Sequence, residues 1–388
     1  MRALWLIRRS LEEQPGGDTI QVLRTAEALR KLGVEVSLSP TIGRDVENYD
    51  VVHLFHLDRV WENLHHSRIL RARNIPTLLT PIFWVSDAYD RQGRSFSQRM
   101  ITRSLGSGML RNVRLAYQWA DQFRRTPKSI TATPPVLGFR RGVRAILRSM
   151  DRVLPSSVAE QHALENLFEM EVASTIVPGA ADSRTFHLSD KPSQRRGALC
   201  AGRIEPRKNQ LSLIRALRDT EIPLTLVGKA GPTAAAYERQ CRKEGGEHVR
   251  FLSDLTPSEM ADTYREAQVH ALVSWYETPG LASLEAALCG CSLVATRGGC
   301  TVEYLGPHAH YCKPDNPASI RRAVLDALDK GPSETLREHI HTEFTWEQAA
   351  RTTLNAYQET LAQRGQGLEK PARPQSSTTS PPTNQSHA

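Results

Sequence analysis

Residues 274–290 read Ser-Trp-Tyr-Glu-Thr-Pro-Gly-Leu-Ala-Ser-Leu-Glu-Ala-Ala-Leu-Cys-Gly and carry two glutamates, Glu277 and Glu285, eight positions apart. An apolar stretch from Val269 to Val273 precedes them and predicts a strand. Pro279-Gly280 predicts the start of a helix. Glu277 would then lie in the loop at the carboxyl edge of a sheet. Glu285 would lie about five residues into the helix, roughly 7.5 Å along its axis.

This stretch resembles the motif of a glutamate, seven residues and a second glutamate found in family 4 (group 1) of the retaining GT-B glycosyltransferases. In that family a Gly-Gly pair and a third glutamate follow, and Gly298, Gly299 and Glu303 match them. The resemblance implies that Glu277 contacts the transferred sugar and that Glu285 binds the ribose hydroxyls of a nucleotide-sugar donor. It implies a donor-binding loop made of Thr278, Pro279, Gly280 and Leu281. Without these flanks, the two glutamates would be read as a loop charge and a solvated helix residue.

A second block begins at Ala198 with a predicted buried strand, a glycine turn at Gly202 and a helix after Asn209. Arg203 and Lys208 flank the turn, near a helix amino terminus that favours an anion. A forked guanidinium and a compact ammonium together suit a diphosphate. In the family, the residues that match Arg203 and Lys208 hold the donor diphosphate and offset the charge that builds on it. Taken alone, they would be read as two surface cations beside a turn.

Two further glycine loops belong to the same resemblance. Gly16-Gly17 follows the first apolar stretch, where a missing side chain lets backbone approach a ligand. The spacing is not that of a dinucleotide fingerprint. By resemblance, Gly17 faces the donor phosphates, and Gly228 belongs to the loop beneath the nucleotide.

Strand and helix patterns alternate along most of the chain and predict an α/β fold with parallel sheets. The resemblance implies a GT-B arrangement, in which two Rossmann-like domains face each other across a cleft. We expect an acceptor domain over 1–185 and a donor domain over 186–345. A helix over 346–364 should cross back to the first domain, and a Pro/Ser/Thr/Gln-rich tail over 365–388 should be disordered. The pattern is least readable between Val85 and Met150.

Composition limits the class of protein. The chain has 388 residues, enough for two domains, and a formal net charge of +8. It contains no run of eighteen apolar residues and no signal-peptide pattern, and its six cysteines lack metal-ligand spacing. We therefore expect a cytoplasmic protein with reduced thiols. Much of the positive charge lies within 91–152, which predicts either a solvated helix face or a contact with an anionic membrane or acceptor. No nucleic-acid-binding motif accompanies this charge.

The resulting hypothesis is a retaining glycosyltransferase, working in cell-surface polysaccharide or glycoconjugate synthesis. It would use a nucleotide-sugar and a glycan, lipid or metabolite acceptor. Glu277, Arg203 and Lys208 are the candidate catalytic residues. The chain contains no Asp-x-Asp sequence, so we expect no metal cofactor. The alternatives are a GT-B scaffold that has lost catalysis and a nucleotide-sugar epimerase.

Many family members carry a histidine after the fourth strand of the first domain, and none stands in Leu78-Leu-Thr-Pro-Ile-Phe-Trp84. His53 and His56, after the preceding strand, are candidates for the acceptor side, although histidines there are as often packing or surface groups. The sequence does not reveal the base of the donor, the sugar, the acceptor or the oligomeric state.

Overall fold

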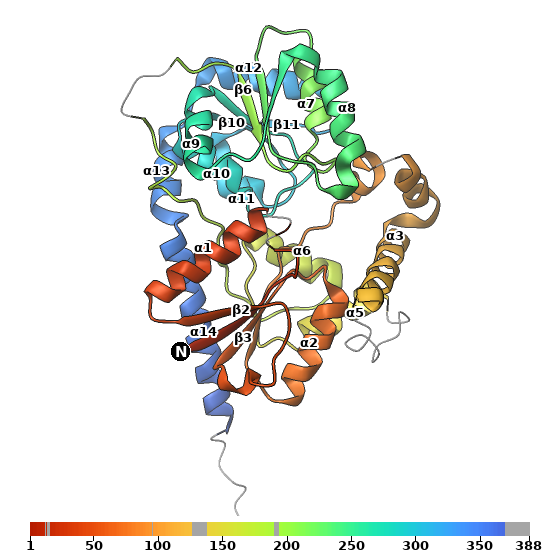
Figure 1. Cartoon of the computed structure of the whole chain (residues 1–388), viewed down its shortest axis with the longest axis vertical. Coiled ribbons are helices and arrows are strands. Elements are labelled where there is room, and N and C mark those ends of the chain that lie inside the picture. Colours follow the sequence, from red (N-terminus) through yellow and green to blue (C-terminus); the bar gives the residue numbers. More distant parts are fainter. Residues whose placement is uncertain (12, 14–15, 95, 126–137, 190–193, 369–388) are drawn as a thin grey trace, which may run out of the picture.

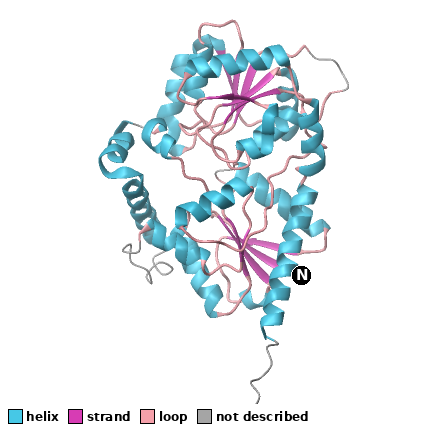
Figure 2. Ribbon diagram, turned by 180° about the vertical axis from the view of Figure 1, so that it is seen from behind, coloured by secondary structure: helices cyan, strands magenta, loops and turns pink. Residues whose placement is uncertain are grey.

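A computed structural model describes residues 1–11, 13, 16–94, 96–125, 138–189 and 194–368. Each half of these residues forms a parallel sheet covered by helices on both faces (Figures 1 and 2). This confirms the predicted pair of Rossmann-like domains. No helix of the described residues is long and apolar enough to cross a bilayer.

The first domain contains a five-stranded sheet in the order β2-β1-β3-β4-β5. Its strands are β1 (Arg2–Leu6), β2 (Glu35–Ser39), β3 (Val51–Phe55), β4 (Thr77–Thr80) and β5 (Arg152–Val153). Its helices are α1 (Gly17–Lys31), α2 (Val60–Ala72), α3 (Phe96–Arg125), α5 (Phe139–Leu147) and α6 (Val158–Phe168), with shorter turns η1 (Val46–Asn48) and η2 (Tyr89–Gly93). Ser157 caps α6, because its side chain accepts a hydrogen bond from the amide of Glu160.

The second domain contains a six-stranded sheet in the order β11-β10-β9-β6-β7-β8. Its strands are β6 (Ala198–Ala201), β7 (Leu224–Val227), β8 (Val249–Leu252), β9 (Val269–Leu272), β10 (Ser292–Thr296) and β11 (His310–Cys312). Its helices are α7 (Gln210–Leu217), α8 (Ala235–Gly245), α9 (Pro257–Glu266), α10 (Leu281–Leu288), α11 (Thr301–Leu305), α12 (Pro317–Lys330) and α13 (Glu334–Glu343). Short 3-10 turns are η4 (Pro232–Ala234), η5 (Gly246–His248) and η6 (Gly306–His308). In each parallel sheet all strand ends of one kind share an edge, so the loops after β6, β7, β9 and β10 meet on one side.

The last helix, α14 (Trp346–Leu368), leaves the second domain and runs alongside the first (Figure 1). Its Tyr357 hydroxyl accepts a 2.9 Å hydrogen bond from Trp5 Nε1 in the buried face of the first sheet. Arg364 donates to both carboxylate oxygens of Asp151 at 2.9 Å. The helix continues to Leu368, past the predicted boundary at 364, and the rest of the predicted tail lies outside the described residues.

The apolar core connects the two domains. One continuous cluster contains Trp5 and Leu29 of the first domain, Leu284 of the second and Tyr357 of α14. Two other clusters fill the opposite faces of the two sheets. The predicted domains are therefore joined by buried apolar surface.

Candidate active site

The loop after β9 places Glu277 against the Gly298-Gly299 pair. The backbone of Glu277 donates to Gly298 O at 3.2 Å and accepts from Cys300 N at 2.8 Å. Gly299 has φ +81, and a Cβ there would overlap the carbonyl oxygen of Glu277. The glycine pair is therefore needed to bring two backbones together, and it fixes the position of Glu277.

Glu277 forms a buried ion pair with Lys208. Its Oε1 lies 2.6 Å from Lys208 Nζ and 3.5 Å from a guanidinium nitrogen of Arg207, and its side chain is 10% exposed. Burial raises the pKa of Glu277, but the charges of Lys208 and Arg207 outweigh this and lower the pKa to about 2. Glu277 is therefore an ionised carboxylate at the carboxyl edge of the sheet.

Arg207 is a site residue that the sequence analysis missed. It pairs with Glu205 at 2.8 Å, lies over the ring of Tyr276 at 5.3 Å and donates to the Tyr276 carbonyl at 3.0 Å. The sequence signal that could have identified Arg207 was its position directly before Lys208. Two adjacent cations can both pair with one buried carboxylate. Arg207 joins the loop after β6 to the loop after β9.

Arg203 faces the first domain. Its side chain is 47% exposed. A Cβ placed on Gly16 would lie 3.9 Å from the guanidinium carbon of Arg203, and one on Gly17 would lie 3.8 Å from Leu281. The structure thus brings the predicted glycine loop of the first domain against two predicted donor-site residues of the second.

The other predicted glycines have structural reasons for their positions. Gly202 and Gly228 adopt φ +145 and +142 at adjacent strand ends, where a side chain on Gly228 would overlap the carbonyl of Gly202. A Cβ on Gly202 would also lie 3.5 Å from Lys208 Cε. Gly280 has φ +66 and caps α10 in the left-handed conformation. These glycines allow the two loops to approach Lys208 and Glu277 closely.

Glu285 lies on α10 and faces α9. The hydroxyl of Tyr264 donates to its Oε2 at 3.3 Å. Burial raises the pKa of Glu285 to about 7, and the hydrogen bond from Tyr264 only partly offsets this. The two glutamates of the motif thus differ in charge state: Glu277 is ionised, and Glu285 titrates near neutrality.

A polar contact joins α11 of the second domain to α6 of the first, and we call it the α11–α6 contact. The carboxylate of Glu303 accepts hydrogen bonds from the first two amides of α6, Val158 N at 2.8 Å and Ala159 N at 2.9 Å. The buried hydroxyl of Tyr304 donates to Ser156 O at 2.6 Å and accepts from Gly179 N at 2.8 Å. The third glutamate of the motif therefore bonds the two domains together.

Aromatic side chains of the two domains also contact each other. Tyr89, in η2 of the first domain, has its ring 6.3 Å from that of Trp275 and 6.0 Å from that of Tyr276. Gly93 comes so close to Trp275 that a Cβ there would lie 2.6 Å from the indole nitrogen. Tyr89 and Gly93 belong to the stretch after Val85 that the sequence left unread.

The two candidate histidines have different positions. His53 is buried in the first domain, with Nδ1 2.7 Å from the Tyr357 hydroxyl and Nε2 2.8 Å from Thr80 Oγ1. Burial lowers its pKa to about 3, so the ring is neutral. His53 therefore has the packing role that the sequence left open, and it lies in the core of the first domain. His56 lies at the carboxyl end of β3, where Nε2 is 3.3 Å from Asp18 Oδ2.

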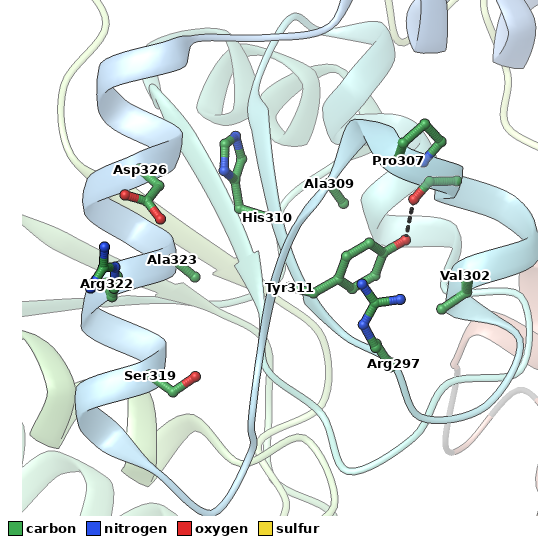
Figure 3. Close-up of a pocket in the computed structure, with 11 residues that line it drawn as sticks. Arg297, Val302, Pro307, Ala309, His310, Tyr311, Ser319, Arg322, Ala323 and Asp326 are labelled. Atoms are coloured by element: carbon green, nitrogen blue, oxygen red, sulfur yellow. Dashed lines mark hydrogen bonds between the residues drawn. The ribbon is translucent and has the colours of Figure 1, made fainter.

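A cavity of about 770 Å³ lies away from these residues, along the edge strand β11 (Figure 3). Arg297 lies over the ring of Tyr311 at 4.3 Å, and the Tyr311 hydroxyl donates to Gly306 O. Ser319, Arg322 and Asp326 project from α12 on the other side. None of the predicted site residues lines this cavity.

The described residues contain no group of three or more His, Cys, Asp or Glu side chains placed to hold a metal ion.

Comparison with known proteins agrees with this geometry. Residues 184–343, which include the Arg203 loop and both motif glutamates, match the family model described as glycosyl transferases group 1. This segment of the chain is therefore similar to the group 1 glycosyl transferases. A D-inositol 3-phosphate glycosyltransferase of Kribbella flavida is 30% identical over 255 residues, which are 57% of this chain and 60% of that protein.

The chain thus spans about 60% of the length of that curated relative of the group 1 enzymes. Among solved structures, a sucrose-phosphate synthase from Thermosynechococcus elongatus aligns with a TM-score of 0.69 and 19% identity, over 93% of this chain and 99% of that one. HepE of Anabaena, solved in complex with UDP-glucose, aligns with a TM-score of 0.60 and 15% identity, over 95% of this chain and 99% of HepE. The fold of this chain is therefore GT-B, as the resemblance implied.

Proposed function

We propose that this protein is a retaining glycosyltransferase that moves a sugar from a nucleotide-sugar to a hydroxyl group of an acceptor. One observation carries the proposal: the buried Glu277–Lys208 pair lies beside the exposed Arg203, opposite the glycine loop of the first domain. The relatives support a transferase, since the Kribbella flavida protein is named a glycosyltransferase and the HepE structure contains UDP-glucose.

In the proposed mechanism, Arg203 and Lys208 bind the diphosphate of the donor and stabilise the charge that develops on it as the glycosidic bond breaks. Glu277 lies near the transferred sugar, where an ionised carboxylate stabilises an oxocarbenium-like centre. Glu285 binds the ribose hydroxyls. The acceptor oxygen bonds to the anomeric carbon on the face that the diphosphate leaves, and its proton passes to the departing phosphate oxygen. This mechanism requires no metal ion.

Donor binding is the first test. The full chain is screened by thermal shift against UDP, GDP, ADP, CMP and dTDP, because a ligand that binds only the folded state raises the melting temperature. We expect one nucleotide to give a shift that Arg203→Ala abolishes, and EDTA to leave it unchanged. No shift with any of the five nucleotides would contradict the proposal and favour the non-catalytic scaffold.

Product analysis is the second test. The chain is incubated with a sugar nucleotide that carries the base identified in the first test. The acceptors are unphosphorylated polyols and D-inositol 3-phosphate, the compound in the name of the relatives. Mass spectrometry should detect a glycosylated product, and NMR should show that its anomeric configuration is that of the donor. An isomerised sugar nucleotide without transfer would instead identify an epimerase.

We propose in addition that α3 contacts an anionic membrane surface during the reaction. Its exposed apolar residues Met109, Val113 and Tyr117 recur every four positions, which places them along one side of the helix, and Arg103 and Arg114 are exposed on the same helix. The helix stands out to one side of the two domains (Figure 1). Arginines beside an apolar stripe match the charge and the apolar interior of an anionic bilayer surface.

A further inference from the structure

The second domain contains a cavity that the proposed mechanism does not use. It has a volume of about 770 Å³ and lies along β11, the edge strand of the six-stranded sheet (Figure 3). Helix α12 forms one wall, and residues of α11 and η6 contribute to the other. Small-molecule sites in proteins occupy roughly 300–1,000 Å³, so the cavity is large enough for a metabolite.

One arginine of the cavity is held in place by an aromatic ring. The guanidinium carbon of Arg297 lies 4.3 Å from the centre of the Tyr311 ring, and the Tyr311 hydroxyl donates to Gly306 O at 2.6 Å (Figure 3). Within the part of the chain that the structure describes, this guanidinium forms no ion pair. The ring therefore orients Arg297 and leaves its N–H donors to a ligand. Because the guanidinium covers this face of the ring, a nucleotide base cannot stack there.

Helix α12 brings two further charges into the cavity. Arg322 and Asp326 stand four positions apart on the helix, and both side chains are exposed. Opposite charges at this spacing often pair, yet neither side chain forms an ion pair with any residue at the described positions. Arg322 therefore supplies a second guanidinium, and Asp326 supplies a carboxylate that can accept hydrogen bonds.

Uncharged polar groups complete the lining. Burial and the charge of Lys330 lower the pKa of His310, against the opposing effect of Asp326, so the imidazole is neutral near pH 7. A neutral imidazole donates one hydrogen bond and accepts another. The Ser319 hydroxyl accepts a 3.1 Å hydrogen bond from Lys313 N, and its own proton remains available to a ligand.

This combination of groups selects one class of ligand. The two guanidiniums outnumber the single carboxylate, so the cavity favours an anion, and guanidinium groups bind phosphate oxygens with charge-assisted hydrogen bonds. The carboxylate, the hydroxyl and the neutral imidazole suit the hydroxyl groups of a sugar or polyol. An anion without hydroxyl groups would leave these three side chains unused.

We propose that this cavity binds a phosphate monoester of a sugar or polyol. Arg297 and Arg322 supply the positive charge that attracts the phosphate, while Asp326, Ser319 and His310 bind hydroxyl groups. None of the residues assigned to the donor or to catalysis lines the cavity, so the site is additional to the active site. Its ligand binds whether or not the chain transfers sugar.

Isothermal titration calorimetry of the full chain tests the site. The probes are glucose 6-phosphate, glycerol 3-phosphate and myo-inositol 1-phosphate, each compared with its unphosphorylated parent and with inorganic phosphate. We expect at least one monoester to bind saturably, and its parent and inorganic phosphate to bind at least about tenfold more weakly, because each lacks one half of the contacts. Neither Arg203→Ala nor excess UDP should change the affinity for the monoester.

Three substitutions place the ligand in the cavity. Arg297→Gln and Arg322→Gln should each weaken binding of the monoester at least about tenfold, through loss of a charge-assisted hydrogen bond. Asp326→Asn should weaken binding of the monoester but not of inorganic phosphate. Arg239→Gln, an exposed arginine of α8 that does not line the cavity, is the matched control and should bind like the wild-type chain.

Three results would overturn the proposal. They are an absence of saturable binding with all three monoesters, equal affinity for inorganic phosphate, and equal affinity in the Arg297, Arg322 and Arg239 variants. Binding that excess UDP or Arg203→Ala abolishes would place the ligand in the donor site and would overturn it as well. Since none of these measurements requires sugar transfer, they judge the cavity separately from the proposed function.

Discussion

At the scale of single residues, the site is organised by one buried ion pair. Glu277 and Lys208 lie 2.6 Å apart, and both side chains are nearly buried. Removing Lys208 leaves the buried carboxylate of Glu277 with only the more distant guanidinium of Arg207, at 3.5 Å, and breaking a buried pair costs about 3–5 kcal/mol. The same two residues that bind the donor in the proposed mechanism therefore also stabilise the fold.

We expect Lys208→Met to lower the free energy of unfolding by about 3–5 kcal/mol and to abolish transfer. The double variant Lys208→Met/Glu277→Gln should recover much of the stability but none of the activity, because the charge is removed together with its partner. Thermal unfolding and the transfer assay measure the two effects separately. A double variant as unstable as Lys208→Met alone would show that the ion pair is not the source of the loss.

Glu285 makes the free energy of unfolding of the chain depend on pH. Its pKa is raised from 4.5 to about 7, so the folded chain holds this proton more tightly than the unfolded chain does. The resulting stabilisation is fully present below about pH 4.5 and is lost as the pH rises through about 7. Glu285→Gln, which stays neutral, should therefore reduce the fall in melting temperature between pH 5 and pH 8. Glu247→Gln, an exposed change on η5, is the control, and an equal slope in all three chains would contradict the assignment.

At the scale of elements, the α11–α6 contact connects the two halves of the molecule. The buried Tyr304 hydroxyl satisfies one amide and one carbonyl of the first domain. Tyr304→Phe leaves both groups without this partner and should destabilise the folded chain by about 1–3 kcal/mol. We expect faster hydrogen exchange at the amide of Gly179 and a larger radius of gyration in solution.

Tyr311→Phe is the matched control, because the Tyr311 hydroxyl donates to a carbonyl of its own domain. It should leave the exchange rate of Gly179 and the radius of gyration unchanged. If Tyr304→Phe behaved like Tyr311→Phe, the α11–α6 contact would not hold the domains together.

The helix α3 should bind anionic vesicles. We expect the full chain to sediment with vesicles that contain phosphatidylglycerol but not with pure phosphatidylcholine, and less so at high salt. The double change Val113→Ser/Tyr117→Ser should weaken this binding at least about fivefold, because it removes most of the apolar stripe that would enter the bilayer surface. Leu325→Ser, an equally exposed apolar position on α12, should have no effect. Equal binding of both variants would exclude α3 as the contact.

At the scale of the whole molecule, α14 belongs to the core of the first domain although it follows the second in the chain. Its Tyr357 is fully buried against Trp5 and His53. A chain that ends at residue 345 should therefore lose amide protection throughout β1 and β3, while β6 and β9 stay protected. Hydrogen exchange measures this, with a chain that ends at residue 368 as the control. Retained protection of β1 in the shorter chain would contradict this role of α14.

Much of the fold and part of the site could be predicted from the sequence. The strand before Glu277 was found within one residue, because a buried parallel strand is a short continuous apolar run. The motif glutamates, Arg203 and Lys208 were found because their spacing is local. The stretch from Val85 to Met150 was not readable, since the amphipathic α3 contains a break at Gly106 and η2 has no strong periodic pattern.

What the sequence by itself determined is the set of elements, because hydrophobic periodicity and turn residues act within a few positions along the chain. It also determined which residue types can carry charge beside a glycine turn. Only the tertiary structure decided which charges meet: Arg207 with Glu277, Glu303 with the start of α6, and Asp18 with His56. These partners lie far apart in the chain or on different elements, and sheet register and domain packing bring them together. The burial that sets their pKa values likewise exists only in the folded molecule.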